Sequence, residues 1–200
     1  MKKLVVLASG QGTIFRYILE HLGKELPDTT VTALISDKSS CGAIDVAHSN
    51  DIQTIITRRW LKQAQNLEAA FEYTNADLYV MAGFLSILPP AVVQKWKLKI
   101  INTHPSLLPC FGGKGFYGEK VHAKVIESGA KITGCTVHFV TEDIDGGPII
   151  AQKSVEVLDS DTPSSLADRV KPVERELLVS SIRGLLFQKF RISGQRVMFS

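Results

Sequence analysis

Residues 4–15 read Leu-Val-Val-Leu-Ala-Ser-Gly-Gln-Gly-Thr-Ile-Phe. The run 4–8 is continuously apolar over the length of a strand, and a loop with two glycines, 9–13, follows it. From residue 14 to residue 22 apolar side chains recur at helical spacing, and the pattern stops at Gly23. A buried strand joined to a helix by a short glycine loop is typical of the first unit of a parallel α/β sheet.

The alternation of strand and helix continues along the chain. Leu78–Ala82 is apolar on both faces, as a central parallel strand must be. Further strands are predicted at Val31–Ile35, Ile52–Ile56, Ile100–Asn102, Ile132–Thr141, Ile149–Val157 and Arg196–Phe199. Helices are predicted at Ala43–His48, Leu61–Tyr73, Pro90–Trp96, Lys120–Glu127 and from Thr162 to Phe187 despite Pro172.

This pattern predicts an α/β fold, with a single doubly wound, mostly parallel sheet and helices on both faces. No repeat, low-complexity tract or linker interrupts it, so we expect one domain over residues 1–190. Residues 191–200 then form a C-terminal tail with one possible small strand. In such sheets ligands bind beyond the carboxyl ends of the strands, which directs attention to the loops that follow strands.

The composition excludes several classes of protein. The 200 residues carry a net charge of +3, which is too small to indicate a nucleic-acid or membrane surface. No apolar run approaches the roughly 18 residues that a membrane span needs. The 3 cysteines, Cys41, Cys110 and Cys135, are an odd number without metal-ligand spacing. They indicate a reducing, cytoplasmic setting with neither disulfides nor a metal site.

The glycine loop Gly10-Gln11-Gly12-Thr13 opens a helix, where backbone N–H groups and the helix dipole attract anions. A dinucleotide fingerprint would need a third glycine where Phe15 stands, and the Gly-Lys-Ser/Thr of a P-loop is missing. The loop therefore fits a phosphate monoester, and a tight turn without a ligand is the alternative.

Two later loops carry candidate catalytic groups. Asn102 and His104 lie in a segment stiffened by Pro105 and Pro109, where an amide donor and an imidazole suit oxyanion and proton chemistry. A surface turn with a solvated histidine is the alternative. Asp145 lies in a hairpin loop between strands and is followed by two glycines, which leave room for a substrate and free N–H groups.

Together, Asn102–Pro109, Thr136–Pro148 and the glycine loop make the chain similar to the phosphoribosylglycinamide formyltransferase family, over Leu4 to about Leu186. The resemblance implies a folate-dependent transfer of a formyl group from 10-formyltetrahydrofolate to the amine of 5'-phosphoribosylglycinamide in purine biosynthesis. It implies no permanently bound cofactor, small-molecule partners only, and a monomer or homodimer.

The same resemblance assigns residues to roles. Asn102, His104 and Asp145 are the implied catalytic trio. Gly10, Gln11, Gly12, Thr13 and Glu174 are the implied contacts to the phosphoribosylglycinamide. The implied folate contacts are Arg59 (or its neighbour Arg58), Leu85, Ile87, Leu88, Asn102, Thr141 and Asp145.

Three features depart from the family pattern. Thr13-Ile14 replaces Ser-Asn in the glycine loop, and Ser86 stands where an arginine is common. The segment Cys110–Gly118 is longer than the usual version and is similar to a variant found in some bacterial members and in related deformylases. These departures concern substrate contacts more than the chemistry.

Expectations for single side chains follow from the proposed chemistry. A protonated His104 meeting an oxyanion should have a raised pKa, because Asp145 is its negative neighbour. Direct attack by the amine needs no nucleophile, so Cys110 is interpreted as an ordinary loop residue. His138 is interpreted as structural, and His122 as facing solvent.

Alternative functions are a formyltetrahydrofolate deformylase, another folate-dependent formyltransferase acting on tRNA or a nucleotide sugar, and a silent phosphate-binding module. The first two usually carry additional domains, which we do not expect here because the first predicted strand begins at residue 3 and the chain ends soon after the last helix. An intact Asn102, His104 and Asp145 argues against the third.

Overall fold

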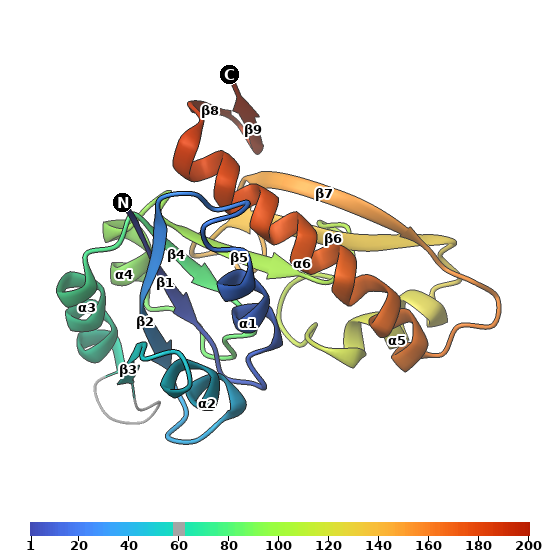
Figure 1. Cartoon of the computed structure of the whole chain (residues 1–200). Coiled ribbons are helices and arrows are strands. Elements are labelled where there is room, and N and C mark those ends of the chain that lie inside the picture. Colours follow the sequence, from blue (N-terminus) through green and yellow to red (C-terminus); the bar gives the residue numbers. More distant parts are fainter. Residues whose placement is uncertain (58–62) are drawn as a thin grey trace. The chain divides into compact units, whose positions relative to one another are not determined.

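A computed structural model describes residues 1–57 and 63–200 of the chain. The chain forms two compact units, Met1–Asn102 and Thr103–Ser200 (Figure 1). Strand β5 (Ile100–His104) crosses the boundary, so its first residues end the first unit and its last residues begin the second.

The described part of the first unit alternates strands and helices. The strands before β5 are β1 (Lys2–Leu7), β2 (Thr29–Ser36), β3 (Gln53–Ile56) and β4 (Leu78–Met81). The helices are α1 (Thr13–Glu20), α2 (Gly42–His48), α3 (Gln63–Thr74) and α4 (Pro90–Lys95). The strands lie in the order β3-β2-β1-β4-β5, and all neighbouring pairs are parallel.

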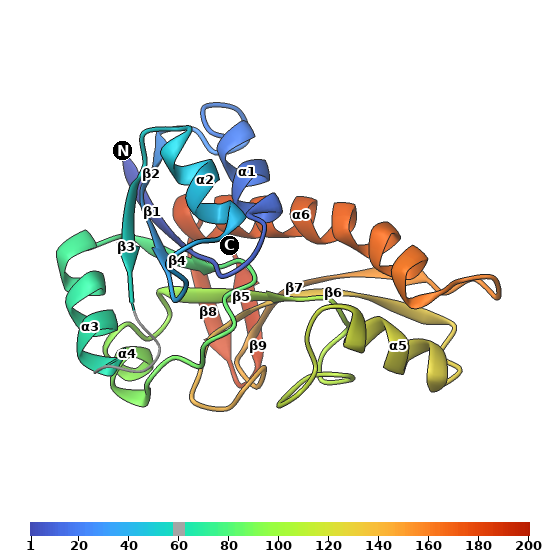
Figure 2. The ribbon, with the colours of Figure 1, turned by 90° about the horizontal axis from the view of Figure 1, so that it is seen from below.

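This order makes the sheet doubly wound, as predicted. The chain first builds outward from β1 to β3 and then returns to place β4 on the other side of β1. Because strand–helix–strand connections are right-handed, a reversal of direction moves the later helices to the opposite face. Figure 2 shows α1 and α2 on one side of these strands and α3 and α4 on the other. The reversal point lies between β1 and β4, where such sheets bind ligands.

Tyr79 anchors the packing of α3 on the first unit. Its ring is fully buried and stacks on Phe71 with 3.9 Å between centroids. Its hydroxyl donates to the Phe71 carbonyl at 2.7 Å and accepts from the buried Ala76 N–H at 3.1 Å. The tyrosine thus satisfies the backbone where the helix ends and β4 begins, which a phenylalanine could not do.

The second unit combines an antiparallel pair with a long helix. Its elements after β5 are α5 (Glu119–Glu127), β6 (Ile132–Phe139), β7 (Ile149–Glu156), α6 (Pro163–Phe187), β8 (Phe190–Ser193) and β9 (Arg196–Phe199). The strands lie in the order β6-β7-β9-β8, with β6 and β7 antiparallel. Helix α6 packs on β6 and β7 and contacts α5.

The start of α6 follows the sequence signal closely. Thr162 is the N-cap: its hydroxyl accepts from the Ser165 N–H at 3.2 Å, and the Ser165 hydroxyl accepts from the Thr162 N–H at 2.9 Å. This reciprocal pair satisfies two N–H groups that a helix leaves free. The helix then continues through Pro172 to Phe187, as predicted.

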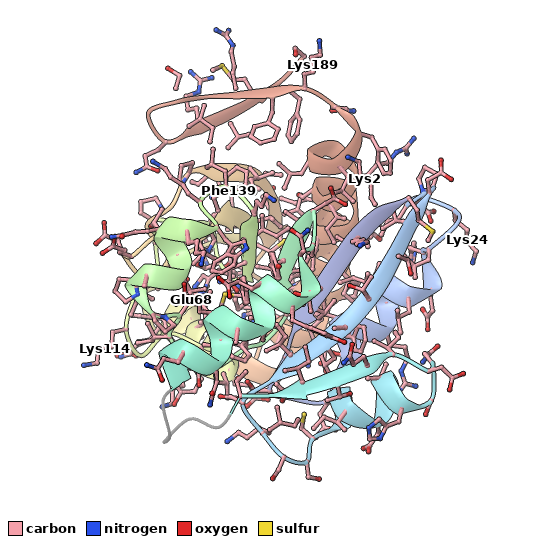
Figure 3. The ribbon with its side chains drawn as sticks, turned by 90° about the vertical axis from the view of Figure 1, so that its left-hand side faces the viewer. Lys2, Lys24, Glu68, Lys114, Phe139 and Lys189 are labelled. Atoms are coloured by element: carbon pink, nitrogen blue, oxygen red, sulfur yellow. The ribbon has the colours of Figure 1, made fainter. Side chains whose placement is uncertain are left out.

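The C-terminal residues form a hairpin where the sequence predicted one possible strand. Both β8 and β9 are present, and only the second of them was predicted. Phe190 lies 5.7 Å from Phe139 of β6 and 6.2 Å from Phe199, measured between ring centroids. Figure 3 shows Lys189 at the start of this hairpin, with Phe139 beneath it. The aromatic contacts attach the hairpin to the second unit.

Other predicted elements are confirmed within a few residues. The predicted helix Leu61–Tyr73 corresponds to α3, although its first residues, 61 and 62, lie outside the described part of the chain. The predicted strand Ile132–Thr141 ends at Phe139, because the loop toward β7 begins there. Among the described residues, no helix is both long and apolar enough to cross a membrane.

We expect Tyr79→Phe to lower the free energy of unfolding by about 1–3 kcal/mol, because the buried Ala76 N–H loses its acceptor. Tyr73→Phe is the matched control, since Tyr73 is 70% exposed and the change should stay within about 0.5 kcal/mol. Urea unfolding of both variants measures the difference. Equal stability of the two variants would show that the hydroxyl of Tyr79 is not needed.

Candidate active site

The two glycines of the first loop have different tasks. Gly12 is the N-cap of α1 at φ 74°, and a Cβ there would lie 2.7 Å from the Cα of Ala43. The Ala43 N–H also donates to the carbonyl of Gly10 at 3.0 Å, which fixes the loop against α2. A Cβ on Gly10, in contrast, would meet nothing within 4 Å. Gly12 is therefore required by the backbone, whereas Gly10 borders open space.

The loops after β1 and β4 are joined at the reversal point of the sheet. The Ser9 hydroxyl accepts from the Leu85 N–H at 3.0 Å, and the Ser9 N–H donates to the Gly83 carbonyl at 3.1 Å. The side chains of Leu85 and Ile87 are 56% and 65% exposed, whereas Leu88 is buried. The site thus offers apolar surface from the loop after β4, next to the polar loop after β1.

Ser86 replaces a guanidinium by a hydroxyl that turns inward. It is buried and donates to Asp37 Oδ2 at 2.5 Å. The other carboxylate oxygen of Asp37, Oδ1, is buried without a hydrogen-bond partner. The hydroxyl of Ser86 is therefore bonded to Asp37, the residue after β2, and does not extend toward a ligand.

Asn102 and His104 lie on one strand, β5. Asn102 pairs with Met81 of β4, the last residue of that strand. It thus lies at the carboxyl edge of the parallel sheet, as do the loops after β1 and β4. Residues two apart on a strand point to the same face, so the amide of Asn102 and the imidazole of His104 share a face of β5.

The imidazole of His104 is 4% exposed and is held from two sides. Its Nε2 lies 2.8 Å from the Phe111 carbonyl, and because a carbonyl only accepts, Nε2 carries the proton. Its Nδ1 lies 3.6 Å from Asp145 Oδ2. Burial lowers the pKa of His104, and Asp145 and the Phe111 carbonyl offset this only in part. The expectation of a raised pKa is wrong for this structure, because it neglected desolvation.

Asp145 is placed by the loop between β6 and β7. Its backbone is left-handed, at φ 56°, a conformation that aspartate tolerates better than most residues. A Cβ on Gly147 would lie 1.8 Å from the Phe139 carbonyl, and the Gly146 N–H donates to the Asp143 carbonyl at 3.1 Å. The two glycines were expected to leave room for a substrate, but they serve the turn itself.

Two imidazoles and one backbone N–H surround the Asp145 carboxylate. Burial raises its pKa, but His138, His104 and the Gly113 N–H outweigh burial, and the pKa ends below its ordinary value. The Gly113 N–H donates to Oδ2 at 2.9 Å, and His138 Nε2 lies 3.6 Å from Oδ1. The carboxylate is thus ionised and positioned between two imidazoles.

His138 is a site residue that the sequence analysis missed. It is 2% exposed, and its Nδ1 donates to the Phe139 carbonyl at 2.9 Å, which turns Nε2 toward Asp145. Its position in the middle of a strand gave no signal, since it reaches Asp145 only through the hairpin pairing of β6 and β7. His122, expected to face solvent, is also buried, and burial lowers its pKa.

Comparisons with known proteins identify the family of the chain. The sequence profile described as "Formyl transferase" matches residues 2–182. The chain belongs to the formyl transferase family. A phosphoribosylglycinamide formyltransferase of Bacillus subtilis is 35% identical over 194 residues, covering 93% of this chain and 95% of that protein. The crystal structure of the enzyme from Anaplasma phagocytophilum is 30% identical with a TM-score of 0.90, and covers 100% of this chain and 94% of that one.

Other relatives differ more in length or sequence. The chloroplastic phosphoribosylglycinamide formyltransferase of Arabidopsis thaliana is 37% identical over 95% of this chain, which spans 67% of that relative's length. A formyltetrahydrofolate deformylase of Pseudomonas syringae has a TM-score of 0.87 at 24% identity, over 100% of this chain and 66% of that one. At this identity the likeness shows the shared fold alone.

Glu174 of α6 is buried, and its carboxylate oxygen Oε1 accepts a hydrogen bond from the Thr103 hydroxyl at 3.0 Å. Burial raises the pKa of Glu174. It also raises that of Cys135 to about 12, so this thiol is not ionised near neutral pH. The Thr141 hydroxyl donates to the Asp143 carbonyl at 3.2 Å and helps to shape the Asp145 loop.

Some predictions are left open. Arg58 and Arg59, expected near folate, lie outside the described residues.

Among residues 1–57 and 63–200, no group of three or more His, Cys, Asp and Glu side chains is arranged to hold a metal ion.

We expect Asp145→Asn to lower the pH at which His104 titrates, because the carboxylate is the strongest influence that raises its pKa. An NMR titration of the imidazole in the free protein measures the shift. Asp143→Asn is the matched control, since Asp143 is exposed in the same loop and has no ion pair with His104. An unchanged or higher His104 titration in Asp145→Asn would contradict the assignment.

Proposed function

We propose that the chain transfers the formyl group of 10-formyltetrahydrofolate to the primary amine of 5'-phosphoribosylglycinamide by direct attack of that amine. The observation that carries this proposal is the buried His104, which faces a carboxylate that three groups of the second unit hold in place. The membership of the chain in the formyl transferase family supports the reaction class.

The chemistry needs a donor for the oxyanion and an acceptor for a proton. When the amine attacks, negative charge develops on the former carbonyl oxygen, and the attacking nitrogen becomes cationic. We assign the oxyanion to the amide of Asn102 and to a protonated His104. Because Nε2 is held by Phe111, Nδ1, which lies 3.6 Å from Asp145 Oδ2, is the nitrogen that gains the proton.

Asp145 has two tasks in this proposal. It stabilises the protonated form of His104 against the effect of burial. It also accepts, directly or through a water molecule, the proton that the attacking amine must lose. Its lowered pKa means that it is ionised near neutral pH and available for both tasks.

Substrate contacts follow from the family resemblance and from the first unit. We assign the ribose phosphate to Gly10, Gln11, Gly12 and Thr13, where α1 begins with free N–H groups. We assign the folate ring to Leu85, Ile87 and Leu88, together with Thr141, Asn102 and Asp145. Arg59 is assigned to the folate side, and Glu174 to the glycinamide substrate.

Further proposals concern the chain as a whole. Residues 1–190 form the formyltransferase domain, and residues 191–200 are an appended tail. We infer that the protein acts in the cytoplasm as a monomer or homodimer, with small molecules as its only partners. A deformylase would use water in place of the amine, so an assay that follows folate absorbance with and without phosphoribosylglycinamide distinguishes transfer from hydrolysis.

We expect His104→Ala, Asn102→Ala and Asp145→Ala each to lower turnover by roughly 10² or more, as the loss of an oxyanion donor does. Combined variants should lose far less than the product of the single losses, because the residues act as a unit. His48→Ala, an exposed residue at the end of α2, is the control with unchanged turnover. Near-normal turnover in a folded single variant would remove that residue from the trio.

We expect Gly10→Ala to raise the KM for phosphoribosylglycinamide about tenfold, since a loss of about 1.4 kcal/mol in binding corresponds to that factor. The added methyl group points into open space, so the melting temperature should not change. Gly12→Ala is the contrasting variant, because its Cβ meets Ala43 and the protein itself should be destabilised. An unchanged KM in Gly10→Ala would place the phosphate elsewhere.

We expect Cys110→Ser to remain fully active, because direct attack by the amine requires no thiolate. Cys110 is exposed, so alkylation of the thiol with a small reagent should also leave transfer activity in place. A folded but inactive Cys110→Ser protein would replace direct attack by a covalent mechanism.

A further inference from the structure

The residues between β5 and α5 reach both His104 and Asp145 through the main chain. We call residues 110–118 the 110–118 loop. The carbonyl of Phe111 accepts from His104 Nε2 at 2.8 Å, and the N–H of Gly113 donates to Asp145 Oδ2 at 2.9 Å. Two residues of one loop therefore hold the two ionisable members of the site, and neither uses its side chain.

The entry to this loop is fixed to the β6–β7 pair. The Leu108 N–H donates to Thr136 Oγ1 at 3.0 Å, and Gln152 Nε2 donates to the Leu108 carbonyl at 2.9 Å. The Ser106 hydroxyl donates to the carbonyl of Cys110 at 2.6 Å. Because Thr136 and Gln152 belong to β6 and β7, the sheet determines where Phe111 and Gly113 are presented.

A side chain on Gly112 would be crowded by Leu108 and Asp145. A Cβ on Gly112 would lie 2.4 Å from Leu108 Cδ2 and 3.3 Å from the Cβ of Asp145. On either side of it, Phe111 at φ 55° and Gly113 at φ 92° adopt left-handed backbone conformations. Strained or unusual backbone that surrounding contacts maintain is common at functional sites. Gly112 thus allows the loop to come close enough for both main-chain hydrogen bonds.

We propose that Phe111 and Gly113 are positioning residues of the active site, which act through His104 and Asp145. Phe111 fixes the proton of His104 on Nε2, so that Nδ1 is the nitrogen that exchanges its proton during transfer. Gly113 orients Asp145 and keeps the carboxylate ionised. The role in transfer rests on the proposed function, whereas the effect on the two ionisable groups is a property of the free protein.

Several titratable groups influence the pair within the described part of the chain. Asp145 faces His104 and His138. The imidazole of His104 faces Asp145 and His138 and also influences His122 of α5, which Glu119 and Lys171 influence in turn. The two loop groups are uncharged dipoles, so their removal leaves this set of charges unchanged. A shift in titration on displacing the loop then reports the lost hydrogen bonds.

The test is Gly112→Ala, which pushes the loop away from Asp145. Loss of the Gly113 N–H should raise the pKa of Asp145, and loss of the Phe111 carbonyl should lower that of His104. The pH range over which kcat/KM is high should become narrower. The acid limb should move to higher pH and the alkaline limb to lower pH, each by at least about half a pH unit. At the optimum, kcat should fall roughly tenfold to a hundredfold, as expected for misplaced catalytic groups. A loop that matters only for stability would lower Tm and leave both limbs in place.

Two further variants control for general damage. Gly115→Ala strains the same loop at φ 95° but meets nothing within 4 Å, so both limbs should stay at their wild-type pH. Leu108→Val combined with Gly112→Ala removes the closest clash and should return both limbs toward the wild type. Equal narrowing in Gly112→Ala and Gly115→Ala, or no recovery in the double variant, would overturn the proposal.

The free wild-type protein gives a readout that needs neither activity nor a variant. In ¹⁵N NMR spectra, neutral His104 should be the Nε2–H tautomer, and the Gly113 amide should titrate together with the Asp145 carboxylate. A mixed tautomer, or a Gly113 amide that ignores the titration of Asp145, would overturn the positioning role even if transfer is observed. Absence of transfer with both NMR results as expected would instead contradict the proposed function and retain the positioning role.

Discussion

The second unit is organised around one unfavourable placement: an ionised carboxylate with a side chain only 11% exposed. Burial alone would raise the pKa of Asp145, because a charge in a poorly solvated place has lost its water. The Gly113 N–H donates to the carboxylate, and the imidazoles of His104 and His138 lie against it; together these groups keep the pKa of Asp145 below its ordinary value. Each of them comes from a different part of the unit: His104 from β5, His138 from β6 and Gly113 from the loop before α5. Three features are therefore needed to surround the Asp145 carboxylate: the hairpin turn, the pairing of β6 with β7 and the path of the 110–118 loop.

The first unit is organised around a different constraint, which is the path of the loop between β1 and α1. Its parallel strands end at one edge, where the loops after β1 and β4 diverge and Ser9 holds them together. A Cβ on Gly12 would collide with the backbone of Ala43, whereas a Cβ on Gly10 would meet no described atom within 4 Å. The glycine that the backbone requires, Gly12, and the glycine beside open space, Gly10, are thus two positions apart in a single loop.

Sequence reasoning succeeded where the information is local in the chain. The strand–glycine–helix unit and the start of α6 near Thr162 were visible as patterns, whereas His104 was expected in the loop after a strand ending at Asn102 and lies on β5 itself. What it missed depends on contacts between distant segments. His138 reaches Asp145 only because β6 and β7 pair in one register, and His122 is buried only because of how its helix packs. The glycines after Asp145 were assigned to a ligand because the carbonyl of Phe139, which fills that space, is not readable from the sequence.

The error about His104 shows why desolvation has to be weighed together with charge. From the sequence, a negative neighbour implies a raised pKa; in the structure, burial of the ring is the larger effect and the pKa is lowered. A histidine with a lowered pKa takes up a proton more readily when unfolded, so acidification below about 6.5 favours unfolding. The lowered pKa of Asp145 adds to this at lower pH, because its stabilising contribution is present above the unfolded value and is lost as the pH falls through the folded value. Both effects destabilise the folded protein as the pH falls, and that of His104 begins at a higher pH than that of Asp145. The arrangement that keeps Asp145 ionised therefore makes the free protein sensitive to acid, and an oxyanion bound beside His104 would relieve part of that cost by stabilising its protonated form.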